Sequence, residues 1–281
     1  MTEKIIDLHT HTVFSDGSMT PRELVRHACE SGLSAVAVSD HDSVGGVGEA
    51  IAAGKEFGIE VVPAIELSVK SDTETHILGY FIDTGNRELD EKLREVKKVR
   101  ARRNEETSEL LAKAGFDVKV SEAEALAPGG LVGRAHFARV MVNKGYVPSV
   151  KYAFDEYLAN GRPCYSDIQC LTPEEGVSLI KSAGGGAFVA HLHLIRLDDG
   201  PLRAFLDRLK GFGLDGIEGY YTEYTPEMQE KYQKMASEMG LMISGGTDFH
   251  GKMKPHISIG RGLGNMSIPY SVLEMIKERF A

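Results

Sequence analysis

The sequence contains few cysteines and no long apolar run. Its three cysteines, Cys29, Cys164 and Cys170, are too few and too scattered for a disulfide framework or a cysteine-based zinc site. There is no signal-peptide apolar core and no apolar run of membrane-spanning length, and residues 1–4 lead directly into the first apolar stretch. We therefore expect a protein of the reducing cytoplasm that has no membrane partner.

Positive charge is also scarce, because 32 Lys and Arg residues stand against 41 Asp and Glu residues, a formal net charge of -9. This balance argues against a surface made for bulk binding of duplex DNA or of a membrane. The chain has 281 residues, 42% of them hydrophobic, which suffices for one large α/β barrel or two ordinary domains. The composition leaves the oligomeric state open.

Short apolar runs alternate with amphipathic helical patterns along most of the chain. Capping boxes with proline at the first helical position, at Thr20 and Thr172, begin two of the predicted helices. Strands that alternate with helices predict a parallel sheet, and barrels of this kind gather their chemistry at the carboxyl ends of the strands. The runs typical of strands lie at 5–8, 35–38, 59–65, 77–81, 187–190, 215–218 and 241–244.

From about Gly85 to Gly161 the pattern becomes purely helical, beginning with a long charged helix over 87–114. We interpret this segment as an insertion, with residues 1–99 and 162–281 forming the barrel and residues 100–161 forming a helical, substrate-capping domain. The first helix carries a basic cluster. A solvated face is the simpler interpretation of that cluster, and contact with a phosphate or a nucleic acid is the alternative. The basic residues are Lys92, Arg94, Lys97, Lys98, Arg100, Arg102 and Arg103.

Histidines and carboxylates recur where the predicted strands begin or end. His9 and His11 are two residues apart on the first strand, so their imidazoles point to the same side. Imidazoles and carboxylates suit Mn, Fe and Zn alike. Nine potential ligands exceed what one ion can use, so we expect two or three clustered divalent ions, with Glu66 able to bridge two of them. The nine are His9, His11, Asp16, His41, Glu66, His76, His191, Asp248 and His250.

Two further motifs have less specific spacing. His193 lies on the same side as His191, but its apolar neighbours favour a histidine packed in the core. The segment 133–136 contains Arg134 and His136. Arginine is suited to bidentate binding of phosphate, and a histidine two residues on could add a second donor. A surface arginine and an internally hydrogen-bonded histidine explain the same spacing equally well.

These motifs resemble those of the PHP (polymerase and histidinol phosphatase) superfamily of metal-dependent phosphoesterases. The resemblance implies a distorted (β/α)7 TIM-like barrel with a trinuclear metal site. It places His9, His11, Glu66 and Asp248 on one ion, Glu66, His76 and His191 on a second, and Asp16, His41 and His250 on a third. Family members usually have proline after the position of His191, where this chain has Leu192, so the path of that loop is open. The resemblance rests on 7–11 with 15–17, on 40–42, on Glu66 and His76, and on 190–191 and 246–250.

The helical insertion and residues 134–136 resemble, more narrowly, enzymes that remove the 5′-phosphate from nucleoside 3′,5′-bisphosphates, some of which also trim short RNA from its 5′ end. We expect a metal-bridging hydroxide to attack phosphorus, and Arg134 and His136 to bind a second phosphate of a small substrate. Asp40 and Asp42 could orient the ligands or protonate the leaving group. The expected catalytic residues are Asp16, His41, Glu66, Asp248 and His250.

Three alternatives compete with this interpretation. They are a histidinol-phosphate-type phosphatase, an amidohydrolase-like metal hydrolase, and a PHP module retained for structure or partner binding. The helical insertion argues against the first, and His250 with the pair Glu66 and His76 argues against the second. All nine ligand positions are filled, which argues against the third.

Overall fold

The computed structural model describes residues 4–71, 73–127, 130–168 and 171–281. Cys29 and Cys164 are free thiols, whereas Cys170 and residues 1–3 lie outside the described residues. Within the described ranges, no helix is long and apolar enough to cross a membrane.

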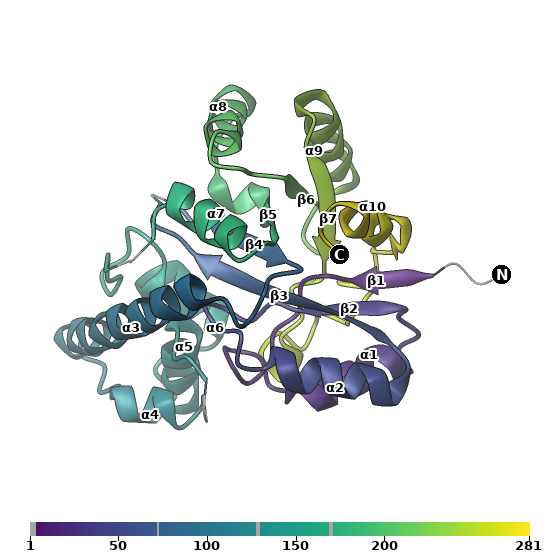
Figure 1. Cartoon of the computed structure of the whole chain (residues 1–281). Coiled ribbons are helices and arrows are strands. Elements are labelled where there is room, and N and C mark those ends of the chain that lie inside the picture. The colour runs from purple at the N-terminus through teal and green to yellow at the C-terminus, as the bar shows by residue number, and fades with distance from the viewer. Residues whose placement is uncertain (1–3, 72, 128–129, 169–170) are drawn as a thin grey trace.

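Eight strands form one nearly closed barrel in the order β7-β6-β5-β4-β3-β2-β1-β8 (Figure 1). The end strand β7 approaches β1, the neighbour of the other end strand β8, where the amide of Leu8, just after β1, donates to the carbonyl of Gly245 in β7 at 3.1 Å. The expected α/β barrel is confirmed. The strands are β1 (Ile5–Asp7), β2 (Ala35–Val38), β3 (Glu60–Ser68), β4 (His76–Tyr80), β5 (Gly186–Val189), β6 (Gly216–Tyr221), β7 (Met242–Gly246) and β8 (Ile268–Pro269).

The strand β4 departs from the parallel sheet that the sequence pattern predicts. It pairs antiparallel with both β3 and β5. The connection over 69–75 is too short for the helical crossover that a parallel strand needs, so the chain turns back directly. This reversal brings the first residue of β4, His76, to the rim at which the parallel strands end. In addition, β3 continues to Ser68, so Glu66 lies within a strand and not after it.

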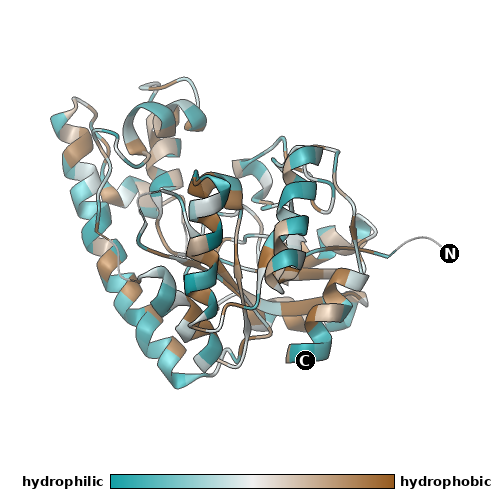
Figure 2. Ribbon diagram, turned by 90° about the horizontal axis from the view of Figure 1, so that it is seen from above, coloured by the Kyte–Doolittle hydropathy of each residue, from teal (hydrophilic) through white to brown (hydrophobic). Residues whose placement is uncertain are grey.

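Helices pack around the outside of the barrel (Figure 1). Thr20 and Thr172 cap the first and third of them through reciprocal hydrogen bonds with Glu23 and Glu175, as the capping boxes predict. Figure 2 shows hydrophobic strands in the interior and hydrophilic outer faces on the helices, so the core lies between sheet and helices. The helices are α1 (Pro21–Glu30), α2 (Val47–Phe57), α7 (Pro173–Ser182), α8 (Asp199–Lys210), α9 (Pro226–Met239) and α10 (Ser271–Phe280).

The long helix α3 (Arg87–Lys113) connects the barrel with a group of helices beside it (Figure 1). Its first half places Leu89 and Leu93 in the hydrophobic core under α7, and its second half places Leu111 in a separate hydrophobic core. The packing therefore changes near the predicted boundary at residue 100, although Cys164 packs in the helical core. The division into barrel and insertion stays a prediction. The group contains α4 (Val120–Glu124), α5 (Arg134–Asn143), α6 (Val150–Ala153) and the π-helical turn η1 (Phe154–Leu158).

Candidate metal centre

The nine predicted ligands converge on one rim of the barrel, although they come from both ends of the chain. His9 and His11 lie beyond the end of β1, and Thr10 between them pairs with Phe249 after β7. A Cβ atom on Gly246 would lie 2.3 Å from the backbone nitrogen of His9, so only glycine permits this approach. That contact brings Asp248 and His250 beside the first histidine pair.

One oxygen of Glu66 belongs to a set of four ligand atoms. Oε2 lies 3.3 Å from Nε2 of His9 and 3.3 Å from Nε2 of His11. The same two nitrogens lie 3.5 Å and 3.1 Å from Oδ1 of Asp248. Two ligands of a tetrahedral ion with bonds of 2.0–2.1 Å lie about 3.4 Å apart, so this spacing fits one metal ion.

The other oxygen of Glu66 faces a second pair of histidines. Oε1 lies 2.9 Å from Nδ1 of His76 and 3.1 Å from Nε2 of His191. These two ring nitrogens are themselves 3.1 Å apart. Glu66 therefore stands between two groups of ligand atoms, as a bridging carboxylate would.

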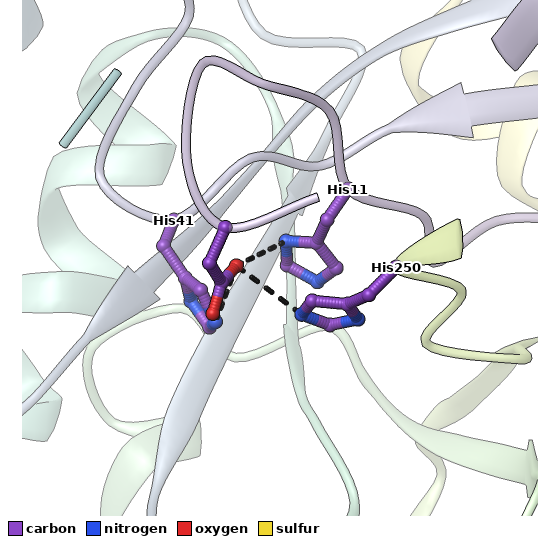
Figure 3. A group of neighbouring side chains, drawn as sticks. His11, His41 and His250 are labelled. Atoms are coloured by element: carbon purple, nitrogen blue, oxygen red, sulfur yellow. Dashed lines mark ion pairs between the residues drawn. The ribbon is translucent and has the colours of Figure 1, made fainter. Parts of the chain in front are cut away.

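A third group surrounds Asp16, and Figure 3 shows the rings of His11, His41 and His250 directed at one carboxylate. Oδ1 of Asp16 lies 3.2 Å from Nε2 of His250 and 3.9 Å from Nε2 of His41. Nδ1 of His11 lies 3.9 Å from the same oxygen. His41 also approaches the first group, because its Nδ1 lies 2.9 Å from Oε2 of Glu66.

The polar atoms of these groups fit divalent cations for a further reason. Five of them are buried and have no hydrogen-bond partner among the described residues. A buried polar atom left without a partner destabilises the fold by about 1–3 kcal/mol. Several such atoms that face one another are explained by a shared cation. The five are Nε2 of His9, Nε2 of His11, Oδ1 of Asp16, Nδ1 of His41 and Oε2 of Glu66.

The protonation states follow from burial and from neighbouring charge. Burial and the adjacent His250 and His41 lower the pKa of His11 to about 3, so its ring is neutral. Burial opposes protonation of His41, but Glu66 and Asp16 outweigh it and raise the pKa of His41 to about 9. Burial would raise the pKa of Glu66, yet the facing histidines hold it well below its usual range. The site therefore holds ionised carboxylates, which attract cations.

A layer of supporting residues fixes these ligands, and the sequence analysis did not identify it. The carboxylate of Glu218 in β6 accepts from Nδ1 of His9 at 2.9 Å and from the backbone amide of His191 at 2.6 Å. Tyr221 and Lys254 donate to Oδ2 of Asp248 at 3.0 Å and 2.6 Å. The signal for Glu218 was an acidic residue at the end of the predicted strand 215–218, which in the structure continues to Tyr221.

Asp40 and Asp42 hold the rim in other ways. Asp40 accepts hydrogen bonds from the amide of Thr12 at 2.7 Å and from the hydroxyl of Ser15 at 2.6 Å, and so supports the loop that carries Asp16. Asp42 forms an ion pair with Arg100 of α3. The second contact ties α3 to the rim that carries the candidate ligands.

The loop after β5 has a distinct path. His191 has a φ of 27°, in the left-handed region, and the 3-10 turn η2 (Leu192–Ile195) follows it. His193 in this turn packs against Tyr221 and Tyr224, at ring distances of 5.4 and 5.5 Å, with Glu223 3.2 Å from its Nε2. His193 therefore packs against aromatic rings but stays partly exposed, so it does not lie in the core as its apolar neighbours predict.

A cleft that opens beside the ligands carries a cluster of arginines. Arg100, Arg103 and Arg134 line it together with Asp16, His41 and His76. The basic residues of α3 therefore lie in two different surroundings. Arg100 and Arg103 are buried and line the cleft, whereas Arg94 is exposed and pairs with Asp90.

The segment with Arg134 and His136 starts α5. The guanidinium of Arg134 lies over the rings of Phe154 and Tyr165, 5.8 and 5.3 Å from their centres. His136 is buried, and its Nδ1 accepts from the amide of Gly133 at 3.0 Å. Of these two residues, Arg134 lines the cleft and His136 does not.

Comparison with known proteins identifies the family to which this chain belongs. A model of the PHP domain matches residues 7–257, which include all nine candidate ligands. The chain belongs to the PHP family. A PHP relative, the 5′-3′ exoribonuclease of Haemophilus influenzae, is 34% identical over 89% of this chain and 91% of its own. The 3′,5′-nucleoside bisphosphate phosphatase of Chromobacterium violaceum is 34% identical over 87% of both chains.

Solved structures agree with the PHP assignment. A metal-dependent phosphoesterase structure from Bifidobacterium adolescentis superimposes with a TM-score of 0.87 and 29% identity, over 99% of this chain and 97% of the other. A structure from Chromobacterium violaceum, described as an amidohydrolase with bound sulfate, gives a TM-score of 0.88 and 29% identity over 98% and 96%. The family, the relatives and the fold identify this PHP protein as a metal-dependent phosphoesterase.

Proposed function

We propose that this PHP phosphoesterase removes the 5′-phosphate from nucleoside 3′,5′-bisphosphates. The observation that carries the proposal is the shared cleft, which four arginines line together with ligands of the rim. They are Arg100, Arg103, Arg134 and Arg196, and the first two are buried. A single phosphate needs only the metal rim, and an additional cluster of guanidiniums suits a second phosphate on the same small molecule. A relative that is named for this substrate supports the choice.

We assign two or three divalent ions, Mn, Fe or Zn, to the rim. The first ion would be held by His9, His11, Glu66 and Asp248. The second would be held by His76 and His191 together with the same Glu66. The third would be held by Asp16, His41 and His250. When bound, such ions lower the pKa of a coordinated water and neutralise charge on the phosphoryl oxygens. The choice among the three metals depends on their availability more than on these ligands.

In this proposal the side chains of the cleft position the substrate. Arg134, held by the rings of Phe154 and Tyr165, binds the 3′-phosphate. His136 is buried and does not line the cleft, so in this proposal it acts indirectly and not as the direct phosphate donor expected from the sequence. Its Nδ1 accepts from the amide of Gly133 and so holds the start of α5, where Arg134 lies. Burial lowers the pKa of His136, which keeps its ring neutral in this role.

Short 5′-phosphorylated RNA is the second proposed substrate, because a relative over nearly the whole chain is named a 5′-3′ exoribonuclease. We propose the cytoplasm as the location of the protein, because its few scattered cysteines suit a reducing compartment.

The test is phosphate release by metal-stripped protein that has been resupplied with Mn²⁺. Adenosine 3′,5′-bisphosphate is compared with 5′-AMP, histidinol phosphate, a short 5′-phosphorylated RNA, and a panel of lactones and amides. We expect the bisphosphate to have the highest kcat/KM among the mononucleotides. Equal rates on 5′-AMP and the bisphosphate would contradict a subsite for the second phosphate, and turnover restricted to lactones or amides would contradict the whole proposal.

A further inference from the structure

A groove lies beside the cleft that carries the arginines. We propose that it binds the nucleotides that follow the first one in a 5′-phosphorylated single-stranded RNA. This inference rests on the proposed function, because it requires the 5′ end to lie at the metal rim. It adds a binding surface that the hydrolysis of a mononucleotide does not need.

The groove is continuous with the cleft. Four residues line both, namely Thr73, Asn160, Tyr165 and Arg196. The groove has a volume of about 830 Å³, within the range of about 300–1,000 Å³ that is usual for ligand sites. It runs from the loop after β3 and the turn after η1 to the outer helix α8.

The charge of the groove is opposite to that of the protein. Lys70, Arg162 and Arg196 line it and are exposed. None of the three side chains forms an ion pair with another described residue. The groove also contains Asp167, the one described acid along its lining, so a local positive charge persists in a chain of net charge -9. Cations that lack an internal partner are available for the phosphates of a ligand.

The groove also offers surfaces on which bases can stack. Phe205 on α8 lines it, with the guanidinium of Arg208 5.5 Å from the centre of its ring. Leu197 is 41% exposed there. Tyr165 lies at the junction with the cleft. A basic track with aromatic rings is the usual composition of a surface that binds single-stranded nucleic acid without regard to sequence.

The chemistry of RNA explains why this groove should adjoin the cleft. In a 3′,5′-bisphosphate the second phosphate ends the molecule, whereas in RNA the equivalent phosphate is a diester that continues to the next nucleotide. An enzyme that binds the first nucleotide by both phosphates therefore needs open space beyond the second one. Arg196, which lines both cavities, stands at that point.

The test separates the groove from the catalytic cleft. Lys70→Ala and Arg162→Ala are combined, since both residues line the groove and neither lines the cleft. The control combines Arg26→Ala and Lys55→Ala, two exposed cations on α1 and α2 that line neither. Binding of a 3′-fluorescein, phosphorothioate-linked hexaribonucleotide, whose 5′-phosphate is replaced by a hydrolysis-resistant 5′-methylenephosphonate, is followed by anisotropy on the metal-loaded protein at several salt concentrations. The kcat/KM for adenosine 3′,5′-bisphosphate is measured in parallel.

We expect the groove variant to bind the hexamer about tenfold or more weakly. Its salt slope should be shallower by about 1.4, because each lost contact to a single-stranded phosphate removes about 0.7. Its kcat/KM for the bisphosphate should stay within about twofold of the control. Hexamer binding that is absent from the unaltered protein, or insensitive to the groove variant, overturns the inference. If the protein binds the hexamer through the groove but releases no phosphate from the bisphosphate, the proposed function fails and the groove stands.

Discussion

Glu218 accepts a hydrogen bond from Nδ1 of His9 at 2.9 Å, and neither side chain is exposed to solvent. Because a carboxylate accepts this hydrogen bond, the hydrogen of the contact is on Nδ1, and a cation that displaces any second ring proton meets the lone pair of Nε2. That nitrogen faces Glu66 and Asp248. Glu218 therefore selects the one tautomer of His9 that can bind a metal ion.

Replacing Glu218 with glutamine should weaken metal binding without removing a ligand. The amide has one acceptor, whereas Glu218 receives hydrogen bonds from both His9 and the backbone amide of His191. One of these donors then faces an NH2 group, and His9 loses its fixed orientation. Supporting residues of this kind typically contribute 10- to 100-fold to metal affinity, so we expect a loss of about that size. Isothermal titration with Mn²⁺ measures it, with an unchanged circular dichroism spectrum as the test that the fold is intact.

The two oxygens of Glu66 predict a difference in metal content between two variants. Glu66→Gln should lose more than one ion per chain, because both the group with His9 and the group with His76 depend on this carboxylate. Asp16→Asn should lose only the ion near His250. Elemental analysis of protein dialysed against Mn²⁺ gives the number of ions bound per chain in each variant. Equal losses in the two variants would contradict the bridging role of Glu66.

The pKa of His41 predicts that the stability of the metal-free protein falls at alkaline pH. Its pKa is raised to about 9 in the folded chain, against 6.5 when unfolded, because the nearby Glu66 and Asp16 favour its charged form over the opposing effect of burial. This stabilisation is complete below about pH 6.5 and is lost as the pH rises through about 9. The shift corresponds to about 3 kcal/mol at most. Urea unfolding of metal-stripped protein at pH 7 and pH 9.5 should show the loss.

Two comparisons sharpen this pH experiment. His41→Gln should make the dependence shallower, since one titrating ring is gone, while His9 and His191, whose pKa values nearby carboxylates such as Glu66 also raise against the effect of burial, still titrate. Bound Mn²⁺ should also reverse it, because a metal ligand must be unprotonated and binding competes with the proton on His41. A stability that rises with pH in the metal-free, unaltered protein across this window would show that His41 is neutral at pH 7.

The ligand set could be predicted from the sequence because ligands interrupt apolar runs. His41 and His191 follow short buried strands, and their place on the rim needs only the rule that parallel strands end at one side of a barrel. His76 was harder, because it reaches the rim only through the reversal of β4. The resemblance to the PHP family grouped it with Glu66 and His191, beside which it lies in the structure, whereas alternation alone predicted a parallel strand.

Residues that act through long-range contacts could not be found in this way. Glu218 lies 209 positions from His9, and no local pattern connects them. Arg100 and Arg103 differed in no visible way from the exposed basic residues of α3, because helical periodicity cannot say which face a cleft will cover. The structure distinguishes them by burial, at 8% and 9% exposure.

The burial of Arg103 predicts opposite effects on stability and on activity. Burial and the neighbouring charges of Arg100 and Arg134 lower the pKa of this guanidinium well below its ordinary value, so its charge is unfavourable in the empty cleft. Its Nε has no hydrogen-bond partner among the described residues. Arg103→Met should therefore raise the melting temperature of the substrate-free protein, because an apolar side chain of similar length suits this position better.

The same change should impair turnover of a bisphosphate, since a phosphate is the partner that the guanidinium lacks. A hydrogen bond to a charged group contributes about 1.5–3 kcal/mol, so kcat/KM for adenosine 3′,5′-bisphosphate should fall about ten- to a hundredfold. An aryl phosphate, with no second phosphate, should be affected far less. Lys98→Met, at an exposed position of the same helix, is the matched control and should change neither quantity. A lower melting temperature with equal losses on both substrates would assign Arg103 to the support of the fold and not to the substrate.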